Sequence, residues 1–218
     1  MSDEVLLEVS GPVAKVTLNR PSSGNALTGE MLGRLVEIMT KVQRDSAVRV
    51  IVLTGAGKYF CTGMDVRKGV NLGKSKPTAP FDAVFKSAKP VVGVLNGPAM
   101  GGGLGLFCCC DVRVCASESF VSLPEVAVGV YPALISAYVV PTFGPSRSQY
   151  MMLTGARVSA EELLAAGVAH ATAPLSELSA ATSRVVKSLL KNSLEAQQGV
   201  KRLIQLVAYG GGEYDDGK

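Results

Sequence analysis

Hydrophobic residues recur along this chain in two patterns, one typical of strands and one typical of amphipathic helices. Residues 5–9 and 13–18 are rich in strand-forming side chains and flank a glycine–proline turn, which predicts two antiparallel strands. From Thr28 to Asp45 the apolar residues fall on one stripe, and this spacing predicts a helix that Thr28 caps. Continuous β-branched runs, typical of strands buried on both faces, follow at 48–54, 91–95 and 112–115.

The second half of the chain is dominated by helical patterns. Helices are predicted at 81–87, 145–153, 176–191 and 194–209, and Ser159 with Glu162 has the spacing of a capping box. Strands that alternate with helices favour an α/β fold with a parallel sheet. We expect a single domain over 1–218, made of a core (1–155), a helical part (156–209) and a flexible tail (210–218).

Composition fits one folded domain and excludes several classes of protein. Of the 218 residues 47% are hydrophobic and 18% charged, which is enough for one substantial core and argues against disorder. The net charge of +4 comes from scattered Lys and Arg, so no nucleic-acid face is expected. No apolar run reaches the roughly 18–20 residues that span a bilayer. With no transit peptide or peroxisomal C-terminus recognisable, we expect a soluble intracellular protein, cytoplasmic by default.

The cysteines and the lone histidine indicate packing and not chemistry. Three cysteines are consecutive, and successive side chains point in different directions, so they cannot converge on one metal ion. We expect all five to be small buried side chains in a reducing compartment: Cys61, Cys108, Cys109, Cys110 and Cys115. His170 has no serine or cysteine motif nearby and is expected to be structural, and no metal site is predicted.

Two strand-to-turn junctions carry the strongest functional signal. The predicted strand 48–54 runs into a glycine-rich turn up to residue 66, and the strand 91–95 runs into Asn96 and a triple glycine, 101–103. Glycine lets backbone approach a ligand closely, and a helix that begins at the triple glycine presents unpaired N–H groups. Two such junctions on neighbouring strands would aim two N–H donors at one oxygen, which is an oxyanion hole.

These segments resemble the signature stretches of the crotonase (enoyl-CoA hydratase/isomerase) superfamily. The two main ones are 60–65 (FCTGMD) and 89–103 (KPVVGVLNGPAMGGG), and shorter similarities follow the same order at 20–27, 110–111, 120–129 and 153–155. The resemblance runs from Val5 to about Tyr209. It implies a crotonase-like ββα spiral with a helical C-terminal region, shortened here because family members usually continue beyond this point.

The resemblance also implies a binding site and its partners. The thioester oxygen of an acyl-CoA would be held by two backbone amides, those of Met64 and Gly102. Residues implied to contact the acyl-CoA substrate are Ala26, Met64, Asp65, Val66, Arg67 and Gly102. Coenzyme A would arrive as part of this substrate, so no separate cofactor is expected. A homo-oligomer, either a trimer or a hexamer, is expected as well.

The acid–base inventory departs from that of the hydratases in the family. Those enzymes are expected to use two glutamates, whereas the matching positions here hold Gly105 and Glu125. One carboxylate beside an oxyanion hole suffices to move a double bond, which favours an enoyl-CoA isomerase with Glu125 as its base. A hydratase-like lyase is the alternative, and a non-catalytic acyl-CoA-binding protein or subunit is the alternative of another class.

Two explanations of Gly105 stay open at this level. Its missing side chain leaves room for a larger acyl group, or the site has lost part of its chemistry. Gly105 lies three residues after Gly102 in the predicted helix and therefore near the same face. A glutamate substituted at this position is accordingly expected to restore the second carboxylate.

Overall fold

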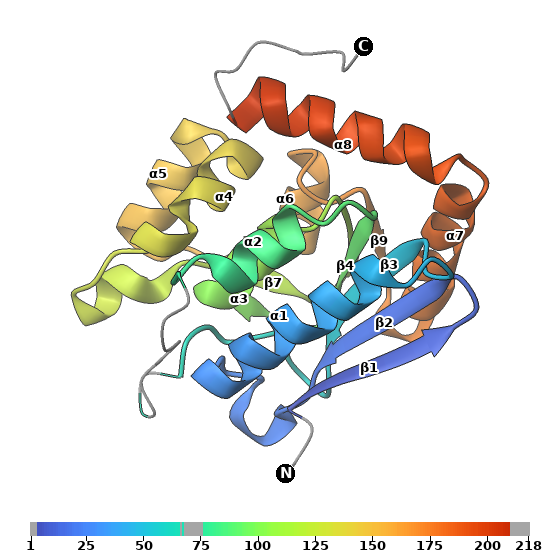
Figure 1. Ribbon diagram of the computed structural model, residues 1–218. Coiled ribbons are helices and arrows are strands. Elements are labelled where there is room, and N and C mark those ends of the chain that lie inside the picture. Colours follow the sequence, from blue (N-terminus) through green and yellow to red (C-terminus); the bar gives the residue numbers. More distant parts are fainter. Residues whose placement is uncertain (1–3, 66, 68–75, 210–218) are drawn as a thin grey trace.

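The computed structural model describes residues 4–65, 67 and 76–209, and the expected tail at 210–218 lies outside them. Within these ranges the main sheet has the strand order β1-β2-β3-β4-β6-β9 (Figure 1). Its strands are β1 (Val5–Ser10), β2 (Val13–Leu18), β3 (Val50–Gly55), β4 (Val91–Leu95), β6 (Val112–Ala116) and β9 (Ala171–Ala173). β1 and β2 pair antiparallel, and every later pair in the sheet is parallel, which confirms the predicted topology.

A second, smaller sheet, with three strands among the described residues, begins with the strand that follows β4 along the chain. It consists of β5 (Ala99–Met100), β7 (Phe120–Ser122) and β8 (Val158–Ser159), in the order β5-β7-β8. β5 pairs with β7 in parallel, and β7 pairs with β8 antiparallel. The chain enters this sheet four residues after β4 ends, so the turn at the end of β4 is fixed between the two sheets.

Eight α-helices are described, with three short 3₁₀ turns between them. The helices are α1 (Gly29–Arg44), α2 (Ala79–Phe85), α3 (Gly102–Cys108), α4 (Ala133–Phe143), α5 (Pro145–Thr154), α6 (Ala160–Ala165), α7 (Leu178–Leu190) and α8 (Leu194–Tyr209). The 3₁₀ turns are η1 (Pro21–Ser23), η2 (Pro124–Val128) and η3 (Leu175–Glu177). Thr28 caps α1 by accepting a hydrogen bond from the Met31 amide at 3.1 Å, and the predicted capping box at Ser159 and Glu162 is present.

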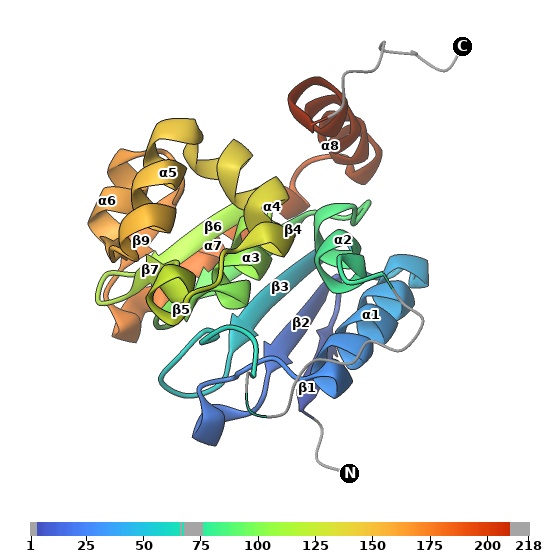
Figure 2. The same cartoon turned by 90° about the vertical axis from the view of Figure 1, so that its left-hand side faces the viewer.

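The two faces of the main sheet carry two separate hydrophobic cores. Alternate residues of β3, such as Ile51 and Leu53, pack into the larger core with α1, α2 and α3. Val50 and Val52 point the other way and pack against α7. Burial on both sides explains the continuous apolar runs of these strands, because a residue on either face loses contact with water. Figure 1 shows α1 crossing in front of the sheet, and Figure 2 shows α4, α5 and α6 grouped apart from α8.

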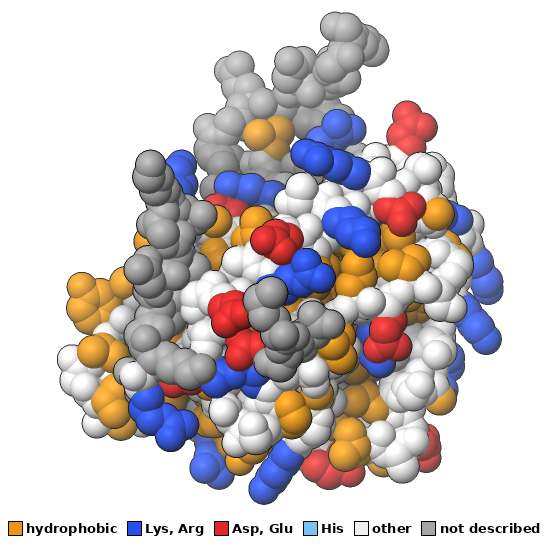
Figure 3. All heavy atoms as spheres, turned by 60° about the horizontal axis from the view of Figure 1, so that its bottom comes forward, with side chains coloured by type: hydrophobic (Ala, Val, Ile, Leu, Met, Phe, Trp, Pro, Cys, Tyr) orange, Lys and Arg blue, Asp and Glu red, His pale blue; other side chains and the backbone are white. Residues whose placement is uncertain are grey.

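Helix α8 lies on the outside of the molecule, held by polar contacts and by the packing of the Tyr209 ring on Phe85, with ring centroids 4.7 Å apart. The ammonium group of Lys201 lies 2.5 Å from the carboxylate of Asp111, and the Gln205 amide donates to the Phe85 carbonyl at 2.7 Å. None of the residues of this helix is fully buried. Across the described ranges, no helix has the length and apolar character to cross a membrane. On the face shown in Figure 3, acidic and basic side chains are interspersed and form no single basic patch.

Candidate active site

The two glycine-rich junctions lie side by side, as the sequence predicts. β3 and β4 are parallel neighbours, so both chains leave the sheet at the same edge. Beyond that edge they pair again, with Cys61 opposite Ala99 and with the Met100 amide donating to the Cys61 carbonyl at 2.9 Å. This second pairing fixes the turn after β3 against the start of α3.

Glycine is required where these two chains touch. A Cβ atom at Gly103 would lie 2.7 Å from the Cβ of Cys61 and closer still to its carbonyl oxygen. Gly63 and Gly101 have φ angles of +102° and +50°, which residues with a side chain rarely adopt. The close approach of the two segments therefore depends on these three glycines.

Two backbone amides meet at this contact. Gly102 is the first residue of α3, so its N–H has no partner inside the helix. The Cβ position of Gly63 would be 3.5 Å from the Gly102 nitrogen, which places the Met64 amide beside it along the chain. Within the described part of the chain, neither the Met64 nor the Gly102 N–H donates a hydrogen bond. The geometry thus provides two adjacent, unused donors.

Glu125 brings a carboxylate to the same place. It lies on η2, and its Oε1 atom is 2.9 Å from where a Cβ of Gly101 would be. Its Oε2 atom is buried and has no hydrogen-bond partner among the described residues. Burial raises the pKa of Glu125 above its ordinary value of 4.5, against a smaller lowering by a backbone hydrogen bond. A partly desolvated carboxylate beside two free amides is suited to proton transfer.

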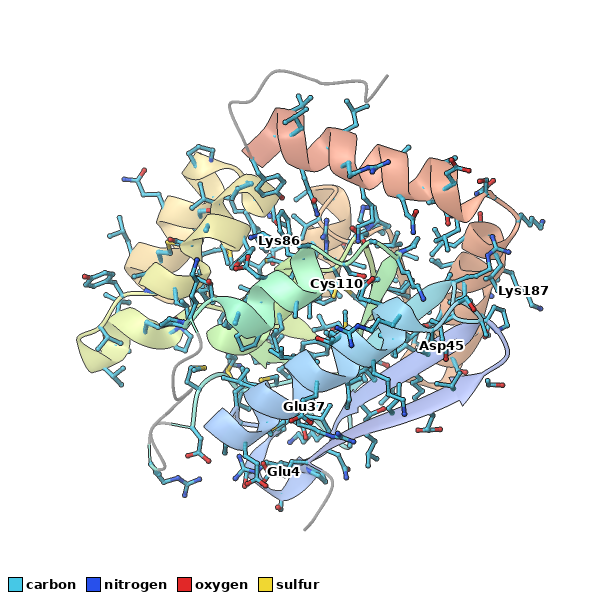
Figure 4. The ribbon with its side chains drawn as sticks, in the orientation of Figure 1. Glu4, Glu37, Asp45, Lys86, Cys110 and Lys187 are labelled. Carbon is cyan, nitrogen blue, oxygen red and sulfur yellow. The ribbon has the colours of Figure 1, made fainter. Side chains whose placement is uncertain are left out.

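Arg20 holds two of the residues implied to contact the substrate. Its guanidinium lies 3.2 Å from the Asp65 carboxylate and donates to the Ala26 carbonyl at 2.5 Å. The Glu4 carboxylate lies 3.2 Å from the Arg20 Nε atom, and Figure 4 shows Glu4 near the N-terminal end of α1. Asp65 is only 5% exposed. Its side chain is therefore engaged with Arg20, a function of the arginine that sequence reasoning missed.

The turn around Ala26 also contacts the segment 63–65, which carries the Met64 amide. The Leu27 amide donates to the Gly63 carbonyl at 2.8 Å, and the Asp65 amide donates to the Leu27 carbonyl at 2.9 Å. The structure thus brings Ala26, Met64, Asp65 and Gly102 together. Arg67 is exposed, with its amide 3.3 Å from an Asp65 carboxylate oxygen, and Val66 lies outside the described residues.

Two expectations about Gly105 need correction: that its missing side chain admits a larger acyl group, and that a glutamate substituted there would restore the second carboxylate. A Cβ at this position would lie 2.8 Å from the Cβ of Ile135, closer still to its Cγ2 atom, and 3.1 Å from the Phe81 ring. The space beside Gly105 is therefore filled, so the idea that it admits a larger acyl group is wrong. A glutamate at position 105 cannot enter this site without displacing Ile135. This packing was not foreseen from the sequence, because the pattern before Pro141 did not predict α4, the helix that carries Ile135.

The histidine and the cysteines are structural, as predicted. The Nδ1 atom of His170 accepts a hydrogen bond from the Arg113 amide at 3.0 Å, where β6 and β9 meet. All five cysteines are free and buried, and Cys110 follows α3 two residues after its last residue, Cys108. Burial raises the pKa of the Cys61 thiol to about 12. This thiol therefore stays protonated near neutral pH and is a poor nucleophile.

Comparison with known proteins agrees with this description. The sequence model of the Enoyl-CoA hydratase/isomerase family matches residues 8–207. The chain is 34% identical to enoyl-CoA hydratase AFT6-1 of Alternaria alternata over 215 residues, which cover 96% of this chain and 72% of that protein. It is 39% identical to (E)-benzylidenesuccinyl-CoA hydratase of Thauera aromatica over 175 residues, covering 75% and 67% respectively. The solved structure of AtuE from Pseudomonas aeruginosa superposes with a TM-score of 0.88 at 30% identity, covering 96% of this chain and 85% of that one.

The fold is the crotonase fold, with a sheet whose glycine-rich edge is followed by helices. The chain belongs to the enoyl-CoA hydratase/isomerase family of enzymes. The names of its relatives include hydratases, a hydratase-lyase and a probable hydrolase, so membership alone leaves the reaction open.

Proposed function

We propose that this protein is an enoyl-CoA isomerase that moves a double bond from position 3 to position 2 of an acyl-CoA thioester. The thioester oxygen would accept hydrogen bonds from the Met64 and Gly102 amides, and Glu125 would be the base. Coenzyme A belongs to the substrate in this proposal, and the reaction as written uses no further cofactor.

The chemistry needs one proton carrier and one anion site. The Glu125 carboxylate removes a proton from C2, and the electrons of that C–H bond delocalise into the thioester as a dienolate. The two amides stabilise the negative charge on the oxygen. Glu125 then returns the proton to C4, which leaves a 2-enoyl thioester and a regenerated carboxylate. No water is consumed.

The observation that carries this proposal is the position of Glu125. Its carboxylate lies against Gly101, one residue from the Gly102 amide, and one of its oxygens is buried without a partner in the described part of the chain. At position 105, where a second acid would complete the pair used for hydration, the chain has glycine. A single carboxylate supports proton shuttling between two carbons, whereas adding water across a double bond calls for two groups to orient it.

The names of several relatives favour hydration as the second candidate. An assay that offers both a 3-enoyl-CoA and a 2-enoyl-CoA, and follows the conjugated thioester spectrophotometrically, separates the two reactions. Turnover of the 3-enoyl substrate without hydration supports the isomerase. Binding of acyl-CoA by calorimetry with neither reaction would instead support a non-catalytic binder.

Substituting the base tests the mechanism. Glu125→Gln retains the shape of the side chain and removes its basicity, so isomerisation should fall by about 10²–10⁴-fold while acyl-CoA affinity stays within a few-fold. Glu161→Gln is the matched control, since Glu161 is exposed on α6. Unchanged turnover in Glu125→Gln would show that another group is the base.

Substitutions at Gly102 test the anion site. Gly102→Pro removes the N–H donor at the first position of α3, where proline is tolerated, and should lower the rate by about 10²–10³. Gly102→Ala is its control, because it retains the N–H and adds a Cβ only 3.2 Å from the flexible Met64 sulfur. If the two variants lose the same amount of activity, the lost donor is not the cause.

A further inference from the structure

Ile135 fills the space beside Gly105. The Cβ position of Gly105 lies 2.8 Å from the Ile135 Cβ, a distance that real Cβ atoms do not show, so residue 105 has to be glycine while Ile135 is present. Ile135 itself is 3% exposed and belongs to the larger core. The two residues therefore act as one packing unit between α3 and α4.

This packing unit lies next to the proposed catalytic carboxylate. The Gly105 amide donates to the Gly101 carbonyl at 3.0 Å, so the two glycines are one helical turn apart. A turn rises roughly 5–6 Å along the axis. Since Glu125 contacts Gly101 and Ile135 contacts Gly105, an acidic side chain at 105 would stand about one turn from Glu125. Two carboxylates at that separation would leave room for a water molecule between them.

Ile135 is held in place by its helix. Tyr138, three residues further along α4, stacks on Phe81 with ring centroids 5.9 Å apart and donates a hydrogen bond to Asp82 at 3.0 Å. Those contacts fix α4 against α2, and the Phe81 ring also lies 3.1 Å from the Cβ position of Gly105. A β-branched side chain has few rotamers, so it cannot readily swing aside.

We propose that Ile135 is a specificity-determining residue, which makes this site an isomerase by occupying the place where a second acid and its water would be. The inference rests on the proposed function, because it explains why one carboxylate works alone. It adds that specificity is set by the pair of positions 105 and 135 together, so that neither can be changed singly to give a hydratase.

A double-mutant comparison of thermal stability tests the packing unit without any activity assay. Gly105→Ala should lower the melting temperature by several degrees in the wild-type background and by about one degree or less in the Ile135→Gly background. Equal shifts in the two backgrounds would overturn the inference, because Ile135 would then not be what excludes a side chain at 105.

Activity tests the specificity itself. In the Gly105→Glu/Ile135→Gly protein, hydration of a short 2-enoyl-CoA should rise at least ten-fold above wild type. The matched control, Gly105→Gln/Ile135→Gly, has nearly the same volume without the acid and should show no such gain. If the stability coupling is present but the two proteins hydrate equally, Ile135 does not determine specificity and the inference fails.

The test of Ile135 and the test of the proposed isomerase activity can fail independently. Wild-type protein that does not isomerise a 3-enoyl-CoA refutes the proposed isomerase. Hydration gained in the Gly105→Glu/Ile135→Gly protein would still support the role of Ile135 as the residue that excludes the second acid. Conversely, a wild type that isomerises through Glu125, with no gain in the double variant, upholds the proposed function and refutes the inference.

Discussion

Adding a single methyl group at Gly103 should separate the two segments that form the site. Gly103→Ala places a Cβ 2.7 Å from the Cβ of Cys61 and closer still to the Cys61 carbonyl oxygen. The backbone there is tied by the Met100–Cys61 hydrogen bond and cannot rotate away as a flexible side chain would. The two chains must therefore move apart by a substantial fraction of an ångström.

The expected cost follows from overpacking of a buried contact. Forcing an additional methyl group into a well-packed interior typically costs about 1–3 kcal/mol. For a chain of this length each kcal/mol corresponds to roughly 2–4 °C in melting temperature, so a decrease of about 2–12 °C is expected. Turnover should fall as well, because Gly103 directly follows the Gly102 amide.

Gly33→Ala is the matched control. It adds the same methyl group to an exposed position in α1 where nothing lies within 4 Å. Alanine is favoured over glycine in a helix by about 0.5–1 kcal/mol, so the melting temperature should rise slightly. Calorimetry or circular dichroism on both variants measures the difference. A Gly103→Ala protein as stable and active as wild type would refute the close contact of the two segments.

Two further predictions concern ionised groups. Burial raises the pKa of Glu125 in the folded protein above its pKa in the unfolded chain. Between these two pKa values the folded protein therefore loses stability as pH rises. Glu125→Gln should accordingly be more stable than wild type at neutral pH, and this difference should shrink on acidification. In a pH–rate profile, the loss of activity on acidification should have its midpoint above 4.5, the pKa of an ordinary glutamate. A midpoint at or below 4.5 would contradict the assignment of Glu125 as the base. Arg20→Met breaks the ion pair between Arg20 and the buried Asp65 and should reduce the free energy of unfolding by about 3–5 kcal/mol, measured in urea. A loss under about 1 kcal/mol would show that this ion pair contributes little to stability.

Much of the fold was predictable because its main elements carry long, regular patterns. Residues 91–95 and 194–209 were predicted with the bounds that β4 and α8 have, and α1 differed by one residue at each end. The strands β5, β7 and β8 were not predicted. Each has two or three residues, too few to show alternation, and their pairing depends on distant parts of the chain.

Helix α4 was missed for a different reason. Its residues are apolar on all sides, so no stripe marks them as helical, and Pro141 indicated a boundary where the helix in fact continues to Phe143. Pro141 has no N–H to donate to the carbonyl four residues earlier, and the helix ends two residues after it. Missing this helix concealed Ile135, and with it the reason for Gly105.

The glycine-rich part of the candidate site could be predicted from the sequence, whereas contacts between residues far apart in the chain could not. The two junctions around Gly63 and Gly102 stand out in the sequence, since only close backbone contact calls for so many glycines. By contrast, the ion pair between Arg20 and Asp65 joins positions 45 residues apart. The local sequence pattern does not indicate this ion pair, because it forms only once Leu27 pairs with Met64 in the folded protein.

The burial of Cys61 has a consequence for the lifetime of the enzyme. A conjugated 2-enoyl thioester is an electrophile that alkylates thiolates, and Cys61 lies two residues before Gly63, in the very segment that lines the site. Its thiol is fully buried, and its sulfur lies 3.4 Å from the Gly63 amide. Because burial raises its pKa to about 12, the thiol stays protonated at neutral pH. For the proposed isomerisation, this means that the conjugated product would lie near a cysteine that burial keeps protonated, so the enzyme would not be alkylated by its own product.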